Sequence, residues 1–278
     1  MQRIALLGLG TMGAGMAANW LAKGFSLKVW NRTRAKAQPL SDKGASVGAT
    51  PRDAAEDADF VFAMVADDSA SREIWLGYDG ALGAARPGAV IVESSTLTPT
   101  WVRELAGHVQ AKGCGFLDAP VGGSRQAAES GELTFFVGGD VATFEAARPA
   151  LAAVGSKINH LGPIGAGATW KLINNQLIAA QIAALAEALD VAEKAGFDRE
   201  QVSDLILAGA SASPIVKMKL PRMIARDFEA TDFAPTRYAA ALAQSLRAPA
   251  YMVSGAARAF ARAEADGLGR KDFSAVAG

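Results

Sequence analysis

The chain has little of what builds disulfide frameworks and metal sites. Its single cysteine, Cys114, has no partner within the chain, so no internal disulfide is possible and a reducing compartment is expected. The two histidines, His108 and His160, lie far apart, and with one cysteine they offer no metal-ligand spacing. We therefore predict a cytoplasmic protein in which Cys114 is a small buried apolar residue and no metal is bound.

An excess of charge of either sign is also absent, and so is a long apolar run. The 28 basic and 28 acidic residues balance, which argues against a nucleic-acid partner. No stretch reaches the roughly 18 uninterrupted apolar residues that suggest a membrane span. The apolar N-terminal run is broken by Gly8, Gly10 and Gly13, which favours a strand and turn over a signal peptide.

Apolar runs and helical patterns alternate along the first part of the 278-residue chain. Strands separated by helices predict an α/β fold with a doubly wound parallel sheet, covered on both faces. From 168 to 194 an alanine-rich helical pattern follows, and later helical stretches are broken at Gly209, Pro214, Pro235 and Pro249. We predict a Rossmann domain over 1–163 and an all-helical domain over 164–278. The expected strands are 4–7, 27–30, 60–65, 89–92, 114–118 and 134–137.

A glycine pattern follows the first predicted strand. Gly8-Leu9-Gly10-Thr11-Met12-Gly13 matches GxGxxG, which is a weak signal alone but is here placed between a strand and a helix. The first glycine permits the tight turn, the second admits a pyrophosphate, and the third allows close packing of helix on strand. The free N–H groups at the helix start would bind the phosphates. The alternative is merely a tight turn.

The end of the second predicted strand bears on the choice of nucleotide. An NAD site usually has a carboxylate there, whereas this chain has Asn31, Arg32 and Thr33. Arg32 can pair with a 2′-phosphate and Thr33 can donate a hydrogen bond to it. We therefore predict NADP as the cofactor; a plain polar turn is the alternative.

A lysine lies in the first turns of the long predicted helix. Lys171, Asn174 and Asn175 are spaced i, i+3 and i+4, so they share one face that we expect to point into an interdomain cleft. A lysine there can protonate a carbonyl oxygen, provided that burial or a nearby cation lowers its pKa from about 10.4. Asn174 or Asn175 could hold the substrate hydroxyl or the lysine amine. A lysine that merely snorkels at a helix end is the alternative.

Four segments together resemble the β-hydroxyacid dehydrogenase family, which includes 3-hydroxyisobutyrate dehydrogenase, tartronate semialdehyde reductase and the glyoxylate/succinic semialdehyde reductases. The resemblance spans nearly the whole chain. Its segments are Gly8–Asn19, Asp118–Ser124 with Gly131, Gly165–Gly167 with Lys171 and Asn174–Asn175, and the tail Gly267–Ala275.

The resemblance implies a small carboxylate substrate and a homodimer or homotetramer. It implies that Lys171 is the essential acid/base and that Asn175 holds the substrate, with Asn174 beside it. The loop at Gly122, Gly123 and Ser124 would bind the substrate carboxylate through accessible backbone N–H groups. Thr96 would lie near the nicotinamide, and Met64, Val65 and Ala66 would lie along the cofactor.

Two departures from the family pattern stand out. Gly122 replaces a serine whose hydroxyl contacts the substrate carboxylate in the family, and Ser124 is a possible compensation. The family's Lys-Asp-Leu segment, whose lysine reaches cofactor or substrate, is absent from the shortened stretch after Phe233. Arg237 is a candidate replacement.

Three functions therefore remain open. The first is NADPH-dependent reduction of short aldehyde acids. The second is imine reduction on the same fold, against which Lys171 counts, because imine reductases generally lack that lysine. The third is cofactor binding with weak or no catalysis, suggested by the two departures.

Overall fold

The computed structural model describes residues 2–228, 242, 251–268 and 272–277. The chain forms two compact units, Met1–Lys171 and Leu172–Gly278. The helix α8 (Ala166–Lys194) begins in the first unit and continues in the second. Each unit is described by itself below.

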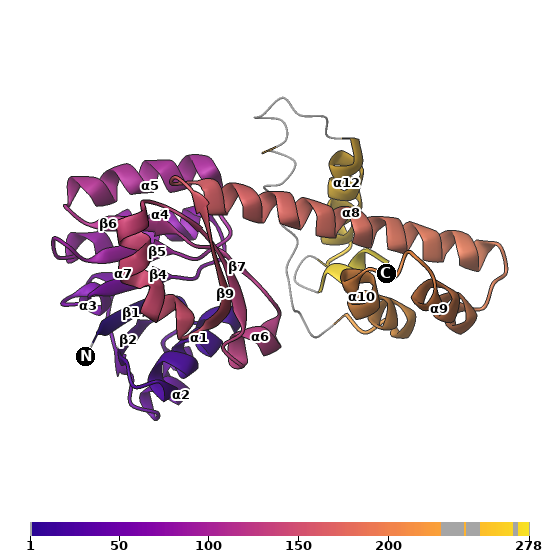
Figure 1. Ribbon diagram of the computed structural model, residues 1–278. Helices are drawn as coiled ribbons and strands as arrows, with labels where there is room; N and C mark the ends of the chain where they lie inside the picture. Colours follow the sequence, from indigo (N-terminus) through magenta and orange to yellow (C-terminus); the bar gives the residue numbers. More distant parts are fainter. Residues whose placement is uncertain (1, 229–241, 243–250, 269–271, 278) are drawn as a thin grey trace. The chain divides into compact units, whose positions relative to one another are not determined.

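The first unit is built on a mostly parallel sheet, which confirms the predicted α/β class (Figure 1). Its strand order is β3-β2-β1-β4-β5-β6-β8-β7, with β9 paired to β8. The first six strands of this order run parallel and follow the 3-2-1-4-5-6 order of Rossmann domains. The strands are β1 (Arg3–Leu7), β2 (Ser26–Trp30), β3 (Ser46–Val47), β4 (Phe60–Ala63), β5 (Val90–Glu93), β6 (Gly115–Asp118), β7 (Val121–Gly122), β8 (Leu133–Gly138) and β9 (Gly155–Gly162).

Helices cover both faces of this sheet because alternate strand residues point to opposite sides. Leu6 belongs to a core with Trp20 of α1 and Phe144 of α7. Leu7 belongs to a second core with Trp75 of α4 and Trp101 of α5. The helices are α1 (Thr11–Ala22), α2 (Gln38–Ser41), α3 (Pro51–Ala55), α4 (Asp68–Leu76), α5 (Pro99–Ala111), α6 (Arg125–Glu129) and α7 (Val141–Ala152), with 3₁₀ turns η1 (Arg34–Ala37) and η2 (Ala81–Gly83).

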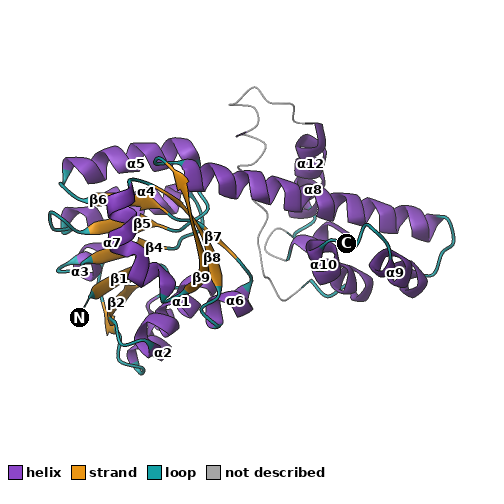
Figure 2. Cartoon of the chain, viewed as in Figure 1, coloured by secondary structure: helices purple, strands orange, loops and turns teal. Residues whose placement is uncertain are grey.

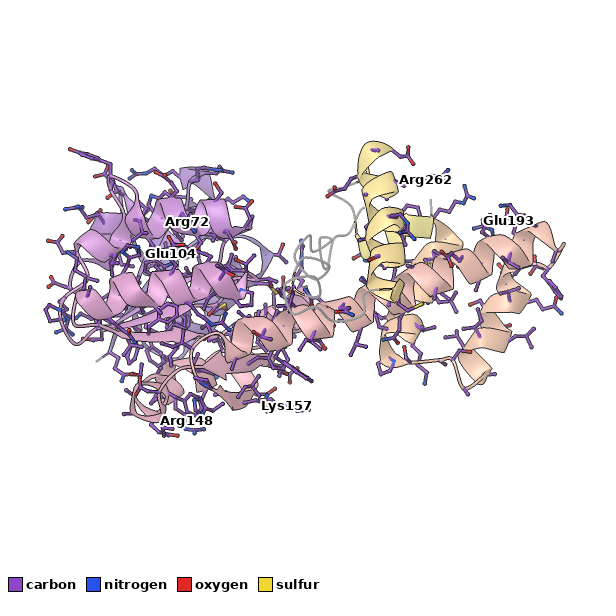
Figure 3. The ribbon with its side chains drawn as sticks, turned by 90° about the horizontal axis from the view of Figure 1, so that it is seen from above. Arg72, Glu104, Arg148, Lys157, Glu193 and Arg262 are labelled. Carbon is purple, nitrogen blue, oxygen red and sulfur yellow. The ribbon has the colours of Figure 1, made fainter. Side chains whose placement is uncertain are left out.

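Two of these helices are joined at the surface by an ion pair. The Arg72 guanidinium on α4 forms a bidentate salt bridge with the Glu104 carboxylate on α5 (Figure 3). Its two nitrogen–oxygen distances are 2.5 and 2.7 Å. The same guanidinium lies 4.0 Å from the ring centroid of Trp101. These contacts hold α4 against α5 over the second core.

The second unit is helical in its described part, as the sequence predicts (Figure 2). It contains most of α8 and also α9 (Arg199–Ala208), α10 (Pro214–Ala225), α12 (Tyr251–Ala265) and the 3₁₀ turn η3 (Phe273–Ala277). Its core includes Ile182, Leu185, Leu220, Met223 and Phe260. The predicted breaks at Gly209 and Pro214 fall at the end of α9 and the start of α10. Pro235, Pro249 and Arg237 lie outside the described residues.

A buried ion pair ties the tail to this unit. The Lys219 ammonium on α10 lies 2.7 Å from a carboxylate oxygen of Asp272, and both side chains are fully buried. Asp272 also accepts hydrogen bonds from the backbone and hydroxyl of Ser274. Asp272 belongs to the tail motif noted in the sequence, so this part of the motif anchors the chain end to α10.

The lone cysteine lies in the interior, as the sequence predicts. Cys114 is buried, and its thiol lies 3.3 Å from the carbonyl oxygen of Arg86. His160 stacks on Phe144 and contacts the carbonyl oxygen of Gly139. Among the described residues, no group of three or more histidine, cysteine or acidic side chains could hold a metal ion.

By length and composition, α8 is also apolar enough to cross a membrane. Among the described residues it is the one helix with this length and composition. Core helices of soluble proteins can share both properties, so the observation is weak evidence for a membrane span. The run is interrupted by Lys171, Asn174 and Asn175, which is why the sequence alone does not suggest a span.

Candidate active site

The glycine-rich turn after β1 is packed so closely that side chains are excluded at two positions. Gly8 has a φ of +105°, and a Cβ there would lie 2.3 Å from the carbonyl oxygen of Met64. A Cβ on Gly13 would lie 2.1 Å from the carbonyl oxygen of Gly8. These two glycines let the turn pass close to β4 and let α1 pack against the turn.

The other side of the turn is open. Gly10 is exposed, and a Cβ placed on it would have no atom within 4 Å. It precedes α1, which begins at Thr11 without a side-chain cap, while Leu9 is buried and Met12 half-buried. A helix start whose first N–H groups lack a side-chain acceptor favours bound phosphate. This part of the turn fits the pyrophosphate of a dinucleotide.

Asn31, directly after β2, joins the turn to the loop that follows. Its Oδ1 accepts a hydrogen bond from the backbone N–H of Leu9 at 2.9 Å. Its Nδ2 donates to the carbonyl oxygen of Thr33 at 2.9 Å. Both polar groups of the Asn31 amide are therefore hydrogen-bonded, and its oxygen faces the glycine-rich turn.

A pocket of about 190 Å³ lies beside Asn31. Both Arg32 and Arg34 line it, and neither forms an ion pair with a described residue. No carboxylate of the described residues lines it; the other lining residues are Trp30, Asn31, Ala37, Val47, Gly48 and Ala49. Thr33 is exposed and is not part of the lining. A lining that contains two arginines suits a phosphate on the ribose.

The loops after β4 and β5 lie at the same carboxyl edge of the sheet, where ligands bind in open α/β folds. Met64 donates its N–H to Leu7, and Val65 donates its N–H to the hydroxyl of Ser95 at 2.8 Å. Ala66 is exposed and Thr96 half-buried. The segments predicted to flank the cofactor are thus tied to each other by one hydrogen bond.

A buried carboxylate, that of Glu93 at the end of β5, is hydrogen-bonded to the loop after β5. It accepts hydrogen bonds from the Ser71 hydroxyl at 2.7 Å, the Trp75 indole at 2.8 Å and the Ser95 backbone at 2.9 Å. The indole of Trp101 donates to Ser71 at 2.9 Å. Burial raises the pKa of Glu93, and the hydrogen bonds from Ser95, Trp75 and Ser71 oppose this rise.

The predicted carboxylate-binding loop follows β6 on the way to α6. Gly122 belongs to β7, and Gly123 has a φ of +132°. A Cβ on Gly122 would lie 3.2 Å from the ring of Phe136, so that ring occupies part of the space where a serine side chain would begin. The Ser124 hydroxyl caps α6 by accepting the N–H of Ala127. Ser124 therefore already has a structural role.

Lys171 lies in the second turn of α8 and is 6% exposed. Burial lowers the pKa of its ammonium from 10.5 to about 8. Its amine forms no hydrogen bond or ion pair with any residue that the structure describes. The snorkelling alternative does not fit, because a snorkelling amine would be exposed.

Asn174 and Asn175 are half-buried and follow Lys171 by about one helical turn. The i, i+3 and i+4 spacing places the three side chains on one face of α8. Lys171 closes the first compact unit, whereas the two asparagines belong to the second.

Asp118, the last residue of β6, holds the start of α8. One carboxylate oxygen accepts the N–H of Gly165 at 2.7 Å, and the other accepts the N–H of Ala168 at 2.8 Å. The side chain is fully buried. Burial raises the pKa of Asp118 to about 6, while the backbone N–H donors oppose this rise.

Two family models together match almost the whole chain. Residues 3–162 match the NAD binding domain of 6-phosphogluconate dehydrogenase. Residues 165–278 match the NAD-binding domain of NADP-dependent 3-hydroxyisobutyrate dehydrogenase. The chain belongs to the β-hydroxyacid dehydrogenase family.

Named members of the family resemble the chain along most of its length. It is 33% identical to glyoxylate/succinic semialdehyde reductase 2 of Arabidopsis thaliana over 279 residues, which are 98% of this chain and 78% of that protein. It is 38% identical to an NAD-dependent L-serine dehydrogenase of Pseudomonas aeruginosa over 206 residues, 74% of this chain and 69% of that protein. The solved structure of 3-hydroxyisobutyrate dehydrogenase from Salmonella typhimurium superimposes with a TM-score of 0.91 at 29% identity, covering 100% and 99% of the two chains.

This β-hydroxyacid dehydrogenase is therefore an oxidoreductase that uses a nicotinamide cofactor.

Sequence reasoning did not select Arg34, Glu93 or Asp118 as site residues. Glu93 and Asp118 carried a signal, because each is a lone acidic residue that ends an apolar, buried strand. Arg34 lies two residues after Arg32, and its place in the pocket depends on the turn η1.

Proposed function

We propose that the protein is an NADPH-dependent oxidoreductase that transfers a hydride between the cofactor and a small β-hydroxyacid or aldehyde acid. Its substrates would belong to the glyoxylate, succinic semialdehyde and 3-hydroxyisobutyrate class. One observation carries the proposal: Lys171 is buried, and its pKa is lowered to about 8. A general acid works best when its pKa lies near the operating pH. An ordinary surface lysine, with a pKa about two units higher, would release its proton less readily.

The side chains have separate roles in this proposal. The Lys171 ammonium donates a proton to the carbonyl oxygen of the substrate during reduction and takes it back during oxidation. Asn175, on the same helix face, holds the substrate oxygen with its amide. The backbone N–H groups of Gly122 and Gly123 bind the carboxylate. The reduced nicotinamide, when bound, supplies the hydride.

The preference for NADPH rests on the pocket beside Asn31. Arg32 and Arg34 line it without a carboxylate, and a 2′-phosphate would pair with guanidinium groups. The Pseudomonas aeruginosa relative is NAD-dependent by name, so family membership alone does not decide the cofactor. The activities named for the three relatives concern glyoxylate, succinic semialdehyde, L-serine and 3-hydroxyisobutyrate, all of which carry a carboxylate.

The experiment follows NADPH oxidation with glyoxylate, succinic semialdehyde and other short aldehyde acids at pH 7. We expect turnover with at least one aldehyde acid and much slower turnover with the matching aldehyde that lacks the carboxylate. The absence of turnover on every aldehyde acid would overturn the proposal.

Gly122 favours a second candidate, a protein that binds the cofactor without turnover. The family's serine hydroxyl is missing there, and the ring of Phe136 lies close to the vacated space. Calorimetry separates the two candidates, because this one requires tight NADPH binding together with no oxidation of NADPH by any aldehyde acid.

A further inference from the structure

Asp118 connects two distant parts of the first unit. Its two carboxylate oxygens accept N–H groups from Gly165 and Ala168, which lie 47 and 50 residues along the chain. The aspartates that cap α4, α7 and α9 each accept N–H groups only two or three residues away. Asp118 therefore fixes where α8 begins on the sheet, which a local cap cannot do.

The helix start packs closely against the backbone around Asp118. A Cβ on Gly138 would lie 2.4 Å from Oδ1 of Asp118, and a Cβ on Gly167 would lie 2.2 Å from the carbonyl oxygen of Phe136. Gly165 has a φ of +90°, which a residue with a side chain rarely adopts. Glycines at these three positions let the first turn of α8 lie directly on the backbones of β6 and β8.

A buried carboxylate is costly to keep unless its oxygens are hydrogen-bonded. At a helix start it receives N–H groups that have no partner within the helix, together with the positive end of the helix dipole. The raised pKa of about 6 still leaves Asp118 mostly ionised at neutral pH. The side chain is thus held in one place by strong hydrogen bonds and transmits that position to α8.

We infer that Asp118 is a positioning residue for the reaction: it fixes the first turn of α8, and thereby places the Lys171 amine, which follows three residues after Ala168. Two residues after Asp118 the chain enters Pro120 and Val121, which lead to the loop at Gly122 and Gly123. One side chain therefore sets the spacing between the proton donor and the loop proposed to bind the carboxylate. The inference rests on the proposed function.

The test replaces one carboxylate oxygen by an amide nitrogen in Asp118→Asn, which cannot accept both N–H groups. The matched control is Asp140→Asn, whose aspartate accepts the N–H of Thr143 at the start of α7, a helix that carries no proposed site residue. A misplacement of about 1 Å costs on the order of a hundredfold in rate. We expect kcat with an aldehyde acid to fall by about that factor in Asp118→Asn, with the Kd for NADPH unchanged, and kcat to stay the same in Asp140→Asn.

A second readout does not depend on activity. Amide hydrogen exchange in the cofactor-free protein should become faster over residues 165–171 in Asp118→Asn, and should stay at the wild-type rate there in Asp140→Asn. A wild-type kcat in Asp118→Asn, or equal losses of kcat and NADPH affinity, would overturn the inference. Should Asp118→Asn not fold, Asp118→Ser takes its place under the same criteria.

The failure of this inference is distinguishable from the failure of the proposed function. If Lys171→Ala is as fast as wild type, the proposed function is wrong whatever Asp118→Asn does. If Lys171→Ala is inactive while Asp118→Asn keeps the wild-type kcat, only the role of Asp118 is wrong.

Discussion

The backbone N–H of Leu9 donates to Oδ1 of Asn31 across 2.9 Å, so the glycine-rich turn is fastened to the loop that carries Arg32. This contact uses the acceptor of a neutral amide at a place where NAD-binding domains usually have a carboxylate. The same contact therefore links the glycine-rich turn to the residue that precedes Arg32 in the pocket lining.

The first prediction concerns cofactor choice. Replacing Arg32 by alanine should raise the KM for NADPH by roughly 10- to 100-fold, because a hydrogen-bonded charge pair contributes about 1.5–3 kcal/mol. The KM for NADH should change less than twofold, as measured by initial rates. Lys36→Ala, in the adjacent turn η1 but outside the pocket lining, serves as the control. Equal losses with both cofactors would contradict the assignment.

The second prediction concerns pH. Lys171 must be protonated to act as the acid, and burial lowers its pKa to about 8. In the direction of reduction, kcat/KM should therefore fall as the pH rises through about 8, and in the direction of oxidation it should rise. Lys171→Arg keeps the charge without titrating in this range, so its residual rate should show no break near pH 8. A flat wild-type profile from pH 7 to pH 9.5 would argue against the assignment.

The third prediction concerns the cost of burying that amine. A pKa lowered from 10.5 to about 8 corresponds to about 3 kcal/mol, which the folded protein loses while Lys171 is charged. Lys171→Met should therefore unfold at higher urea than wild type at pH 7. The folded lysine releases its proton before the unfolded one, so the wild type gains stability between pH 8 and 10.5 and the difference should shrink. A destabilised Lys171→Met variant at pH 7 would contradict this account.

The fourth prediction concerns the buried hydrogen bonds around Glu93, next to the loops after β4 and β5. Ser71→Ala removes the acceptor for the Trp101 indole and one donor to Glu93, all of them buried. We expect a loss of about 1–3 kcal/mol in the free energy of unfolding, measured in urea. The control is Ser69→Ala on the exposed side of α4, which should change stability by less than about 0.5 kcal/mol. Equal stabilities of the two variants would show that the network contributes nothing.

The fifth prediction concerns the departure at Gly122. Gly122→Ser would add a hydroxyl where the family has one, at the expense of a small shift of the Phe136 ring. We expect the KM for an aldehyde acid to fall by roughly tenfold, because a hydrogen bond to a charged group contributes 1.5 kcal/mol or more. Gly122→Ala crowds the same ring without a hydroxyl, so it should not lower the KM. The idea fails if serine and alanine behave alike.

Much of the fold could be predicted from the sequence because the central strands are continuous apolar runs. The run Phe60–Ala63 is buried at every position, as a strand covered on both faces must be. The sequence pattern does not predict the strand β9, because its residues are mostly exposed or half-buried and many are polar. The two-residue strands β3 and β7 are too short to give a periodic signal.

The site could be predicted only where its residues are local in sequence. The turn Gly8–Gly13 and the helix face of Lys171 are spacing patterns within single elements. The role of Asp118 could not be predicted in this way, because its partners lie far along the chain and are backbone groups without a residue signature. The burial of Lys171 likewise depends on tertiary packing.

The most direct test of the account is the rate of NADPH oxidation by Lys171→Met, with the best aldehyde acid, at pH 7 and saturating cofactor. Methionine keeps most of the side-chain length and removes the proton. We expect kcat to fall by about 10²–10⁴-fold, while calorimetry shows that NADPH still binds with the wild-type affinity. A Lys171→Met enzyme that turns over as fast as wild type would contradict the central claim.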